Sequence, residues 1–253
     1  MDDLTGRHAI VTGGGTGIGL AIARALAGAG AEVTITGRRG EVLEAAARDH
    51  ARLHPLQMDV ADEASISAGF EAARAAHGPI TICVANAGIA EGRSLPKTSL
   101  EFWRRTMAIN LDGAFLTMRA ALPDMLEEGW GRVIGVSSIA GLRGLKGGAA
   151  YSASKHGMIG LIRTLSEDYL GSALTFNALC PGYVDTPIVS RNIDIISEKT
   201  GASPEDALKM MTSQNRHGRL IAPEEVAGLA LWLCLPGAVS VNGQALEISG
   251  GQV

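Results

Sequence analysis

The residues best suited to chemistry are a hydroxyl, a phenol and an ammonium, carried by Ser138, Tyr151 and Lys155. If residues 149 to 172 form one helix, Tyr151 and Lys155 lie on the same face, one turn apart. A lysine in that place stabilises the phenolate and so lowers the pKa of the tyrosine. The phenol could then exchange a proton with a bound substrate.

The size of this effect depends on how closed the site is. Lowering a phenol pKa from about 10 to near 7 needs roughly 4 kcal/mol. One positive charge about 5 Å away supplies roughly 3 kcal/mol at an effective dielectric near 20, and less than about 1 kcal/mol in open water. The pair therefore requires a partly closed site. The same spacing also occurs by coincidence on exposed helices, so the rest of the sequence must decide.

A glycine-rich segment near the start of the chain predicts a binding site for a dinucleotide. Residues 9 to 11 read as a buried strand, residues 12 to 19 are rich in glycine, and residues 20 to 26 have helical periodicity. Backbone N–H groups and the helix dipole make such a turn an anion site. Side chains at its glycines would keep the backbone from a pyrophosphate. The expected contacts are Gly13, Gly15, Thr16, Gly17, Ile18 and Gly19.

Strand-like and helix-like segments alternate along the chain. Apolar runs occur at about residues 7 to 12, 32 to 36, 53 to 57, 80 to 84, 132 to 137, 174 to 180 and 245 to 248. This alternation predicts an α/β fold in which a doubly wound parallel sheet of the Rossmann type is covered on both faces. Ligands bind such sheets beyond the carboxyl ends of the strands, where strand order reverses. Most of the chemistry-bearing residues follow predicted strands, so they could converge there.

Residues 186 to 222 interrupt the alternation. They are long for a connection and mix apolar residues with charges. The segment could form a lid over a substrate, or an amphipathic helix pair packed on the edge of the domain. We expect one domain over residues 1 to 253 that contains this segment.

Composition narrows the function. The 253 residues are 46% hydrophobic and carry a net charge of −4, which disfavours nucleic acid and anionic membranes as main partners. The acidic N-terminus lacks the pattern of a signal segment, and the longest apolar stretch, residues 226 to 235, is too short to cross a bilayer. A cytoplasmic protein with a small-molecule ligand is expected.

Cysteines and histidines give no signal of a metal site. Cys83, Cys180 and Cys234 lie among apolar neighbours and suit reduced core thiols. The histidines are scattered without ligand spacing, so no metal is expected.

Taken together, the motifs resemble those of the short-chain dehydrogenase/reductase family over essentially the whole chain. The resemblance rests on Thr12-Gly13-x-x-x-Gly17-x-Gly19, Asp59-Val60, Asn86-Ala87-Gly88, Asn110, Ser137-Ser138, Tyr151-x-x-x-Lys155, Asn177 and Pro181-Gly182, in the family's order. Ala85 and Gly15 depart from common family residues, which affects only local loop geometry.

The resemblance implies roles for these positions. Tyr151 would be the general acid in reduction and the base in oxidation, Lys155 would lower its pKa and bind the nicotinamide ribose, and Ser138 would hydrogen-bond the carbonyl oxygen. Ser138 is preferred to Ser137 because the family's serine precedes the tyrosine by thirteen places. Asn110 would anchor a water chain to Lys155, or alternatively bond only helix backbone. Other cofactor contacts would be Asp59, Val60, Asn86, Ala87, Gly88, Pro181, Gly182, Val184 and Thr186, and the lid would be residues 186 to 222.

The end of the second predicted strand indicates the choice of cofactor. An acidic residue there usually holds the 2′-hydroxyl of NAD(H), whereas a 2′-phosphate requires positive charge. Here residues 33 to 36 run into Gly37-Arg38-Arg39, without a carboxylate. We expect NADP(H) to be preferred through Arg38. Alternatively Arg38 stacks on adenine or starts a helix with Glu41, which leaves NAD(H) acceptable.

Substrate and assembly follow only from resemblance. The C-terminal half looks like aromatic-polyketide ketoreductases and 3-oxoacyl thioester reductases, which suggests a 3-oxoacyl thioester or a bulky apolar ketone. Residues 166 to 172 are acidic where carrier-protein reductases commonly have arginine, so a CoA-linked or free ketone is favoured. Arg132, Arg143 and Lys146 could contact a phosphate, although solvated surface explains each more simply. A homotetramer is expected, with helices at about 99 to 127 and 149 to 172 at its contacts.

Two other functions remain open. One is an NAD-dependent secondary alcohol or 3-hydroxyacyl dehydrogenase that works in the oxidative direction. The other is a cofactor-sensing regulator without catalysis, which the intact Ser138, Tyr151 and Lys155 disfavour.

Overall fold

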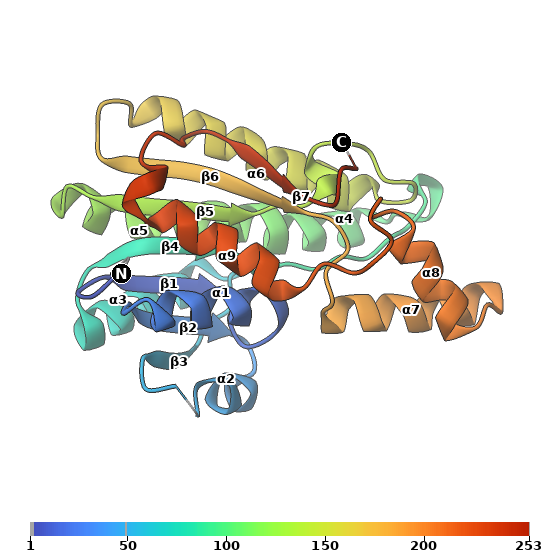
Figure 1. Cartoon of the computed structure of the whole chain (residues 1–253), viewed down its shortest axis with the longest axis horizontal. Coiled ribbons are helices and arrows are strands. Elements are labelled where there is room, and N and C mark those ends of the chain that lie inside the picture. Colours follow the sequence, from blue (N-terminus) through green and yellow to red (C-terminus); the bar gives the residue numbers. More distant parts are fainter. Residues whose placement is uncertain (1–2, 49, 253) are drawn as a thin grey trace.

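The computed structural model describes residues 3–48 and 50–252, and its centre is one parallel sheet (Figure 1). The strand order is β3-β2-β1-β4-β5-β6-β7, and every neighbouring pair runs parallel. The predicted fold class, a single doubly wound domain, is confirmed. The strands are β1 (His8–Thr12), β2 (Glu32–Gly37), β3 (Leu53–Gln57), β4 (Ile80–Ala85), β5 (Gly131–Val136), β6 (Leu174–Pro181) and β7 (Ala245–Ile248).

Helices cover both faces of the sheet, and the alternation of side chains along β1 shows why. Ala9 and Val11 pack with α1 and α9 on one face, while Ile10 packs with α3, α5 and α6 on the other. The helices are α1 (Gly17–Gly28), α2 (Gly40–Ala47), α3 (Glu63–His77), α4 (Leu100–Met107), α5 (Gly113–Glu127), α6 (Ala149–Asp168), α7 (Pro187–Thr200), α8 (Pro204–Thr212) and α9 (Pro223–Cys234).

Strand order reverses beside β1. The chain runs outward from β1 through β2 to β3, and then returns so that β4 pairs with the other side of β1. The connections after β1 and β4 therefore leave the sheet in opposite directions. This opens a crevice at the carboxyl ends of the two strands, where ligands of this fold class bind.

Two predicted helices differ from the structure. The helix expected at 99 to 127 is divided by a π-helical turn, η2 (Ala108–Asp112), between α4 and α5. The helix expected to end at 172 ends at Asp168, because the following residues turn and Gly171 adopts a φ of 85°. Both differences concern where a helix is interrupted or ends, which the periodicity of apolar residues locates poorly.

The segment at 186 to 222 forms two helices, α7 and α8, that lie together beyond the carboxyl end of the sheet (Figure 1). An isolated bridge between Val184 and Ile221 joins the two ends of this excursion. No helix in the described ranges has both the length and the apolar character needed to cross a bilayer.

The cysteines are buried and free, as predicted. Burial raises the pKa of the Cys83 and Cys234 thiols to about 12 and that of Cys180 to about 11, so they stay protonated at neutral pH. The histidines are scattered along the sequence, but the fold brings some of them together. His54 and His77 come together beside Glu32, because the start of a strand and the end of a helix meet at one edge of the sheet.

Candidate active site

A cavity of about 990 Å³ lies at the carboxyl ends of the central strands. Its wall is formed by the glycine turn after β1, the loops after β4, β5 and β6, and the helices α6, α7 and α8. The expected site residues that line it are Gly13, Thr16, Gly17, Ile18, Gly19, Asn86, Ala87, Gly88, Ser138, Tyr151, Lys155, Pro181, Gly182, Val184 and Thr186. Residues from five loops and helices thus converge on one space.

The turn between β1 and α1 has the backbone geometry of an anion site. Gly13 and Gly17 have φ angles of 64° and 55°, which residues with side chains rarely adopt. A Cβ at Gly19 would collide with the Gly13 carbonyl oxygen and lie 2.5 Å from Nδ2 of Asn86. The N-cap residue of α1, Thr16, makes no side-chain capping bond, and no acid occupies the first turn. The N–H groups of this helix start therefore remain available to a phosphate.

A side-chain clamp joins this turn to the loop after β4. The backbone N–H groups of Asn86 and Ala87 both donate to Oγ1 of Thr12, each at a distance of 3.0 Å. The Asn86 side chain returns a bond from Nδ2 to the Thr12 carbonyl at 2.8 Å. These bonds hold the ends of β1 and β4 in fixed relation, so the two predicted cofactor segments form one rigid rim.

A smaller cavity of about 220 Å³ adjoins the first. Gly15, Arg38, Asp59 and Val60 line it, together with residues shared with the main cavity. Nε2 of Gln57 donates to the Arg38 carbonyl at 2.9 Å, which positions the turn after β2. Oδ1 of Asp59 accepts from the backbone N–H of Ala61 at 3.0 Å. Arg38 is exposed at the mouth, so positive charge is presented where β2 ends.

The three candidate reacting groups come from two elements. Ser138 follows β5, and its Oγ accepts from the backbone N–H of Ala140 at 3.1 Å at the start of η3 (Ile139–Gly141). Tyr151 and Lys155 lie one turn apart on α6, as the spacing predicted. A hydrogen bond connects the side chains of Ser138 and Tyr151. The serine, phenol and ammonium therefore border the same part of the cavity.

The pKa shifts differ from the expectation. Burial raises the pKa of Tyr151, and the hydrogen bond from Ser138 offsets this only in part. Burial also lowers the pKa of Lys155 to about 8. The Lys155 ammonium donates to the Val136 carbonyl at 2.8 Å and lies 5.9 Å from the centre of the Tyr151 ring. The predicted lowering of the tyrosine pKa by Lys155 is wrong for this conformation, because desolvation dominates.

Asn110 lies behind the cavity wall. It is completely buried in the π-helical turn, where its Oδ1 accepts from the Ile89 N–H at 2.8 Å and its Nδ2 donates to the Ile89 carbonyl at 3.0 Å. Nδ2 also lies 3.1 Å from Oγ of Ser154. Its partners belong to the loop after β4 and to α6, so it does more than bond helix backbone. It ties the loop to the helix that carries Tyr151 and Lys155.

The loop after β6 leads into the helix pair and lies beside the glycine turn. A Cβ on Gly17 would lie 3.1 Å from Cγ2 of Thr186, the N-cap residue of α7. Fully buried Asn215 supports this loop, since it accepts from the Tyr183 N–H at 3.1 Å and donates to the Tyr183 carbonyl at 2.9 Å. Sequence reasoning missed Asn215, which no motif marks.

Several wall residues carried no sequence signal. The helix pair contributes a mostly apolar surface with one unexpected polar residue on α7, Asn192, and Gln214 lines the cavity just after α8. Ile89, Ala90, Glu91 and Gly92 line the cavity after the Asn-Ala-Gly motif, whose continuation was the available clue. The wall also includes Arg143, whose Nη2 donates to Oε1 of Gln252 at 2.6 Å, and exposed Lys146. Arg132 is instead buried over Trp130 and cannot meet a ligand there.

Comparisons with known proteins agree with this geometry. Residues 7–194 match the family model for short chain dehydrogenases. The chain is 33% identical to a 3-oxoacyl-[acyl-carrier-protein] reductase of Aquifex aeolicus and 34% identical to a D-beta-hydroxybutyrate dehydrogenase of Cupriavidus necator, covering 98% and 99% of both chains respectively.

A solved structure shows the same similarity in three dimensions. A variant of actinorhodin polyketide ketoreductase, crystallised with NADPH, superposes with a TM-score of 0.94 at 34% identity, and the match covers 97% of each chain. Family model, full-length relatives and backbone all agree. The chain belongs to the short-chain dehydrogenase family and is an oxidoreductase.

Proposed function

We propose that the protein reduces a ketone to a secondary alcohol with NADPH, and that Tyr151 supplies the proton. The observation that carries this proposal is the meeting of Ser138, Tyr151 and Lys155 in a cavity continuous with the glycine turn. The turn fits a dinucleotide, because its N–H groups are free of side-chain caps and Gly19 leaves no room for a side chain. A nicotinamide bound there supplies the hydride.

The chain's own residues manage the proton. As the hydride reaches the carbonyl carbon, the Tyr151 hydroxyl gives its proton to the carbonyl oxygen. The Ser138 hydroxyl donates a hydrogen bond to the same oxygen and stabilises its growing charge. The Lys155 ammonium then balances the phenolate that remains. Asn110 acts through position, because it holds the loop at Ile89 against the helix of Tyr151.

The direction of the Tyr151 shift fits a general acid. A general acid must carry its proton before the reaction, and burial raises the pKa of Tyr151, so the phenol is protonated at neutral pH. With a pKa of about 8, Lys155 is still mostly charged at pH 7.

The exposed Arg38 supports NADPH over NADH. It borders the smaller cavity at the end of β2, where the chain continues as Arg38-Arg39 without an acid to accept a ribose 2′-hydroxyl. Asp59, which also lines this cavity, follows β3 instead. A charge-assisted bond to a 2′-phosphate contributes about 1.5–3 kcal/mol, which corresponds to about tenfold to a hundredfold in preference. The polyketide ketoreductase to which the chain is similar was crystallised with NADPH.

For the substrate we propose a 3-oxoacyl thioester or a bulky apolar ketone. The reductase of Aquifex aeolicus is named for a 3-oxoacyl group, and the apolar wall of α7 and α8 suits an acyl chain. The competing function is oxidation of a 3-hydroxy acid, for which the relative from Cupriavidus necator is named.

One assay separates these functions. Initial rates are measured with NADPH and NADH on a 3-oxoacyl-CoA and a bulky ketone, and with NADP⁺ and NAD⁺ on the matching alcohols and on 3-hydroxybutyrate. We expect the highest kcat/KM with NADPH and a ketone. Arg38→Ala should reduce the preference for NADPH about tenfold or more, while Arg24→Ala, an exposed control on α1, should not. A preference for NADH that survives Arg38→Ala would contradict the cofactor assignment.

A further inference from the structure

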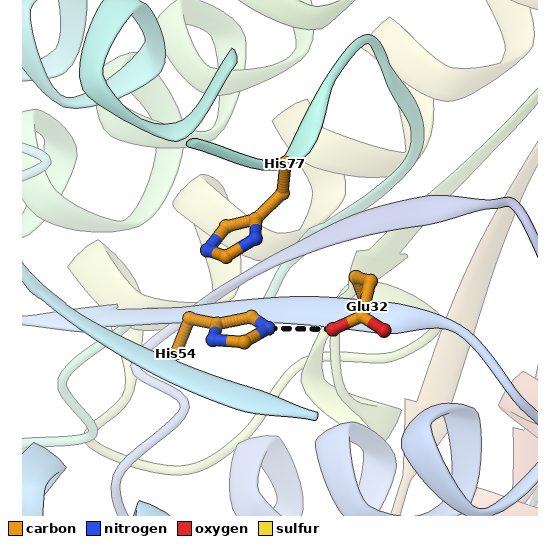
Figure 2. A group of neighbouring side chains, drawn as sticks. All are labelled: Glu32, His54 and His77. Atoms are coloured by element: carbon orange, nitrogen blue, oxygen red, sulfur yellow. Dashed lines mark hydrogen bonds and ion pairs between the residues drawn. The ribbon is translucent and has the colours of Figure 1, made fainter. Parts of the chain in front are cut away.

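Three side chains that can ligate metals meet at the opposite end of the sheet from the cavity. Glu32 begins β2, His54 lies near the start of β3, and His77 ends α3. Figure 2 shows the two imidazole rings one above the other, with the carboxylate of Glu32 directed toward His54. The cluster belongs to the amino edge of the sheet, so the cofactor and substrate machinery does not account for it.

The ligand atoms lie close enough to share an ion. One ring nitrogen from each histidine and one carboxylate oxygen all lie within 4.8 Å of one another. Nε2 of His54 is 2.7 Å from Oε2 of Glu32, and the centres of the two rings are 3.6 Å apart. A tetrahedral ion with bonds of about 2.0–2.1 Å separates its ligand atoms by roughly 3.4 Å. Small side-chain rotations would therefore let all three atoms converge.

The side-chain types of the cluster suit a metal ion of the zinc class. Burial lowers the pKa of the His77 ring, and the neighbouring His54 lowers it further, which favours the neutral imidazole. The hydrogen bond from His54 lowers the pKa of Glu32, which favours the carboxylate. Two imidazoles with one carboxylate form a donor set that binds zinc in many proteins.

The surroundings orient the ligands and leave one side open. His8 packs edge-on against His77 with ring centres 5.6 Å apart, and its own nitrogens lie 2.8 Å from Oγ1 of Thr34 and 2.9 Å from the Gly78 carbonyl. His8 is thus a neighbour already engaged by other groups. The side chains of His54 and Glu32 are 25% and 41% exposed, so water can reach a fourth coordination position.

We propose that Glu32, His54 and His77 form a binding site for a divalent ion of the zinc class, completed by water. The nitrogen-rich donor set selects Zn²⁺, Co²⁺ or Ni²⁺ over Mg²⁺ and Ca²⁺. The ion would tie β2, β3 and α3 together at an edge of the sheet. Its role is structural, because the site lies at the end of the strands remote from Ser138 and Tyr151.

Charged side chains near the cluster and protonation of its ligands both affect the binding of an ion. Arg52 lies 3.5 Å from Oε1 of Glu32 and competes with the ion, while Asp124, held by Arg74 at 2.8 Å, contributes negative charge near His8. Protons compete with the ion for the imidazole nitrogens and the carboxylate, so affinity should fall as the pH falls.

The test uses the whole chain without a histidine tag. Zn²⁺ binding is measured by equilibrium dialysis, and Co²⁺ is used as a probe because its visible absorption reports nitrogen coordination. The ligand variants are Glu32→Gln, His54→Gln and His77→Gln, and the matched control is His217→Gln, an exposed histidine elsewhere. Circular dichroism and melting without metal establish that each variant is folded.

We expect one ion per chain, a higher melting temperature with Zn²⁺, and little change in His217→Gln. Loss of an outer-shell partner alone weakens metal binding about 10–100-fold, so loss of a direct ligand should weaken it at least that much. The proposal is overturned if the wild-type chain binds no Zn²⁺ or Co²⁺ at pH 7.5. It is equally overturned if folded His54→Gln and His77→Gln chains bind the ion as tightly as the wild type.

Discussion

The two walls of the main cavity are built in different ways. The wall at the strand ends is joined by hydrogen bonds that the backbone of the loop after β4 donates to Oγ1 of Thr12 and to Oδ1 of Asn110. The wall of α7 and α8 consists largely of apolar side chains that are partly exposed, with Ile188 at 42% and Met210 at 47%. Rigid polar positioning thus faces an adaptable apolar surface. The first wall suits chemistry that is constant in a family, and the second suits variation in substrate.

The largest effect is expected from Tyr151→Phe, which removes one oxygen from the rigid wall. General acid catalysis contributes about 10²–10⁴-fold, so ketone reduction should fall by that factor. The Kd of NADPH, measured by titration of intrinsic fluorescence, should stay within about twofold of the wild-type value, because the aromatic ring keeps its packing. Activity near the wild-type value in a folded variant would remove Tyr151 from its assigned role.

The second largest effect is expected from crowding the glycine turn. Gly19→Ala places a Cβ against the Gly13 carbonyl and the Asn86 side chain, and overpacking of this kind costs about 1–3 kcal/mol. The variant should lose this amount of free energy either from folding, as measured by denaturant melts, or from NADPH binding, as measured by titration. Gly28→Ala is the matched control, because a Cβ at this end of α1 meets no atom within 4 Å. Equal behaviour of the two variants would show that the turn is not closely packed.

The pH profile tests whether the lysine, held in the rigid wall, governs the proton transfer. Lys155 is charged below its pKa of about 8 and loses its charge as the pH rises through that value. The kcat/KM of reduction should therefore decline by up to about tenfold per pH unit above pH 8. The pKa of Tyr151 is raised above its ordinary 10, so the phenol alone would give a decline only at higher pH. A flat profile to pH 10 would contradict the assignment to Lys155.

The smallest effect is expected at the adaptable wall. Met210→Ala removes apolar surface from the cavity, and at about 0.8 kcal/mol per buried methylene a half-exposed side chain contributes roughly 1 kcal/mol, or about fivefold in KM. The change should appear with bulky ketones and be absent from the Kd of NADPH. Lys209→Ala on the same helix is the control, because Lys209 pairs with Glu205 at 2.9 Å outside the cavity wall. A larger change in the Kd of NADPH than in the KM of the ketone would contradict the roles assigned to the two walls.

The fold was predictable because strong local patterns agree with its global form. Each strand coincides with an apolar run, and the glycine turn lies between β1 and α1 where the motif requires it. That most of the expected site residues would converge was also predictable, since most of them follow strands whose ends meet at one edge. Resemblance to the family assigned them roles that periodicity alone does not give.

What could not be predicted depends on packing between distant segments. The sign of the Tyr151 pKa shift follows from burial, which outweighs the hydrogen bond with Ser138. The support of Tyr183 by Asn215 and the meeting of His54 with His77 likewise require the folded chain, because these residues come from separate elements. The π-helical turn at Asn110 resembles ordinary helix in its periodicity, and its wider bonding pattern becomes visible only in three dimensions.

The contact between Gly17 and Thr186 has a kinetic consequence. Thr186 is the N-cap residue of α7, so the start of the helix pair lies beside the glycine turn. A nucleotide bound at this turn would restrict the start of α7 and, with it, one wall of the substrate space. Steady-state turnover should therefore follow a compulsory order, in which the nucleotide enters first and leaves last.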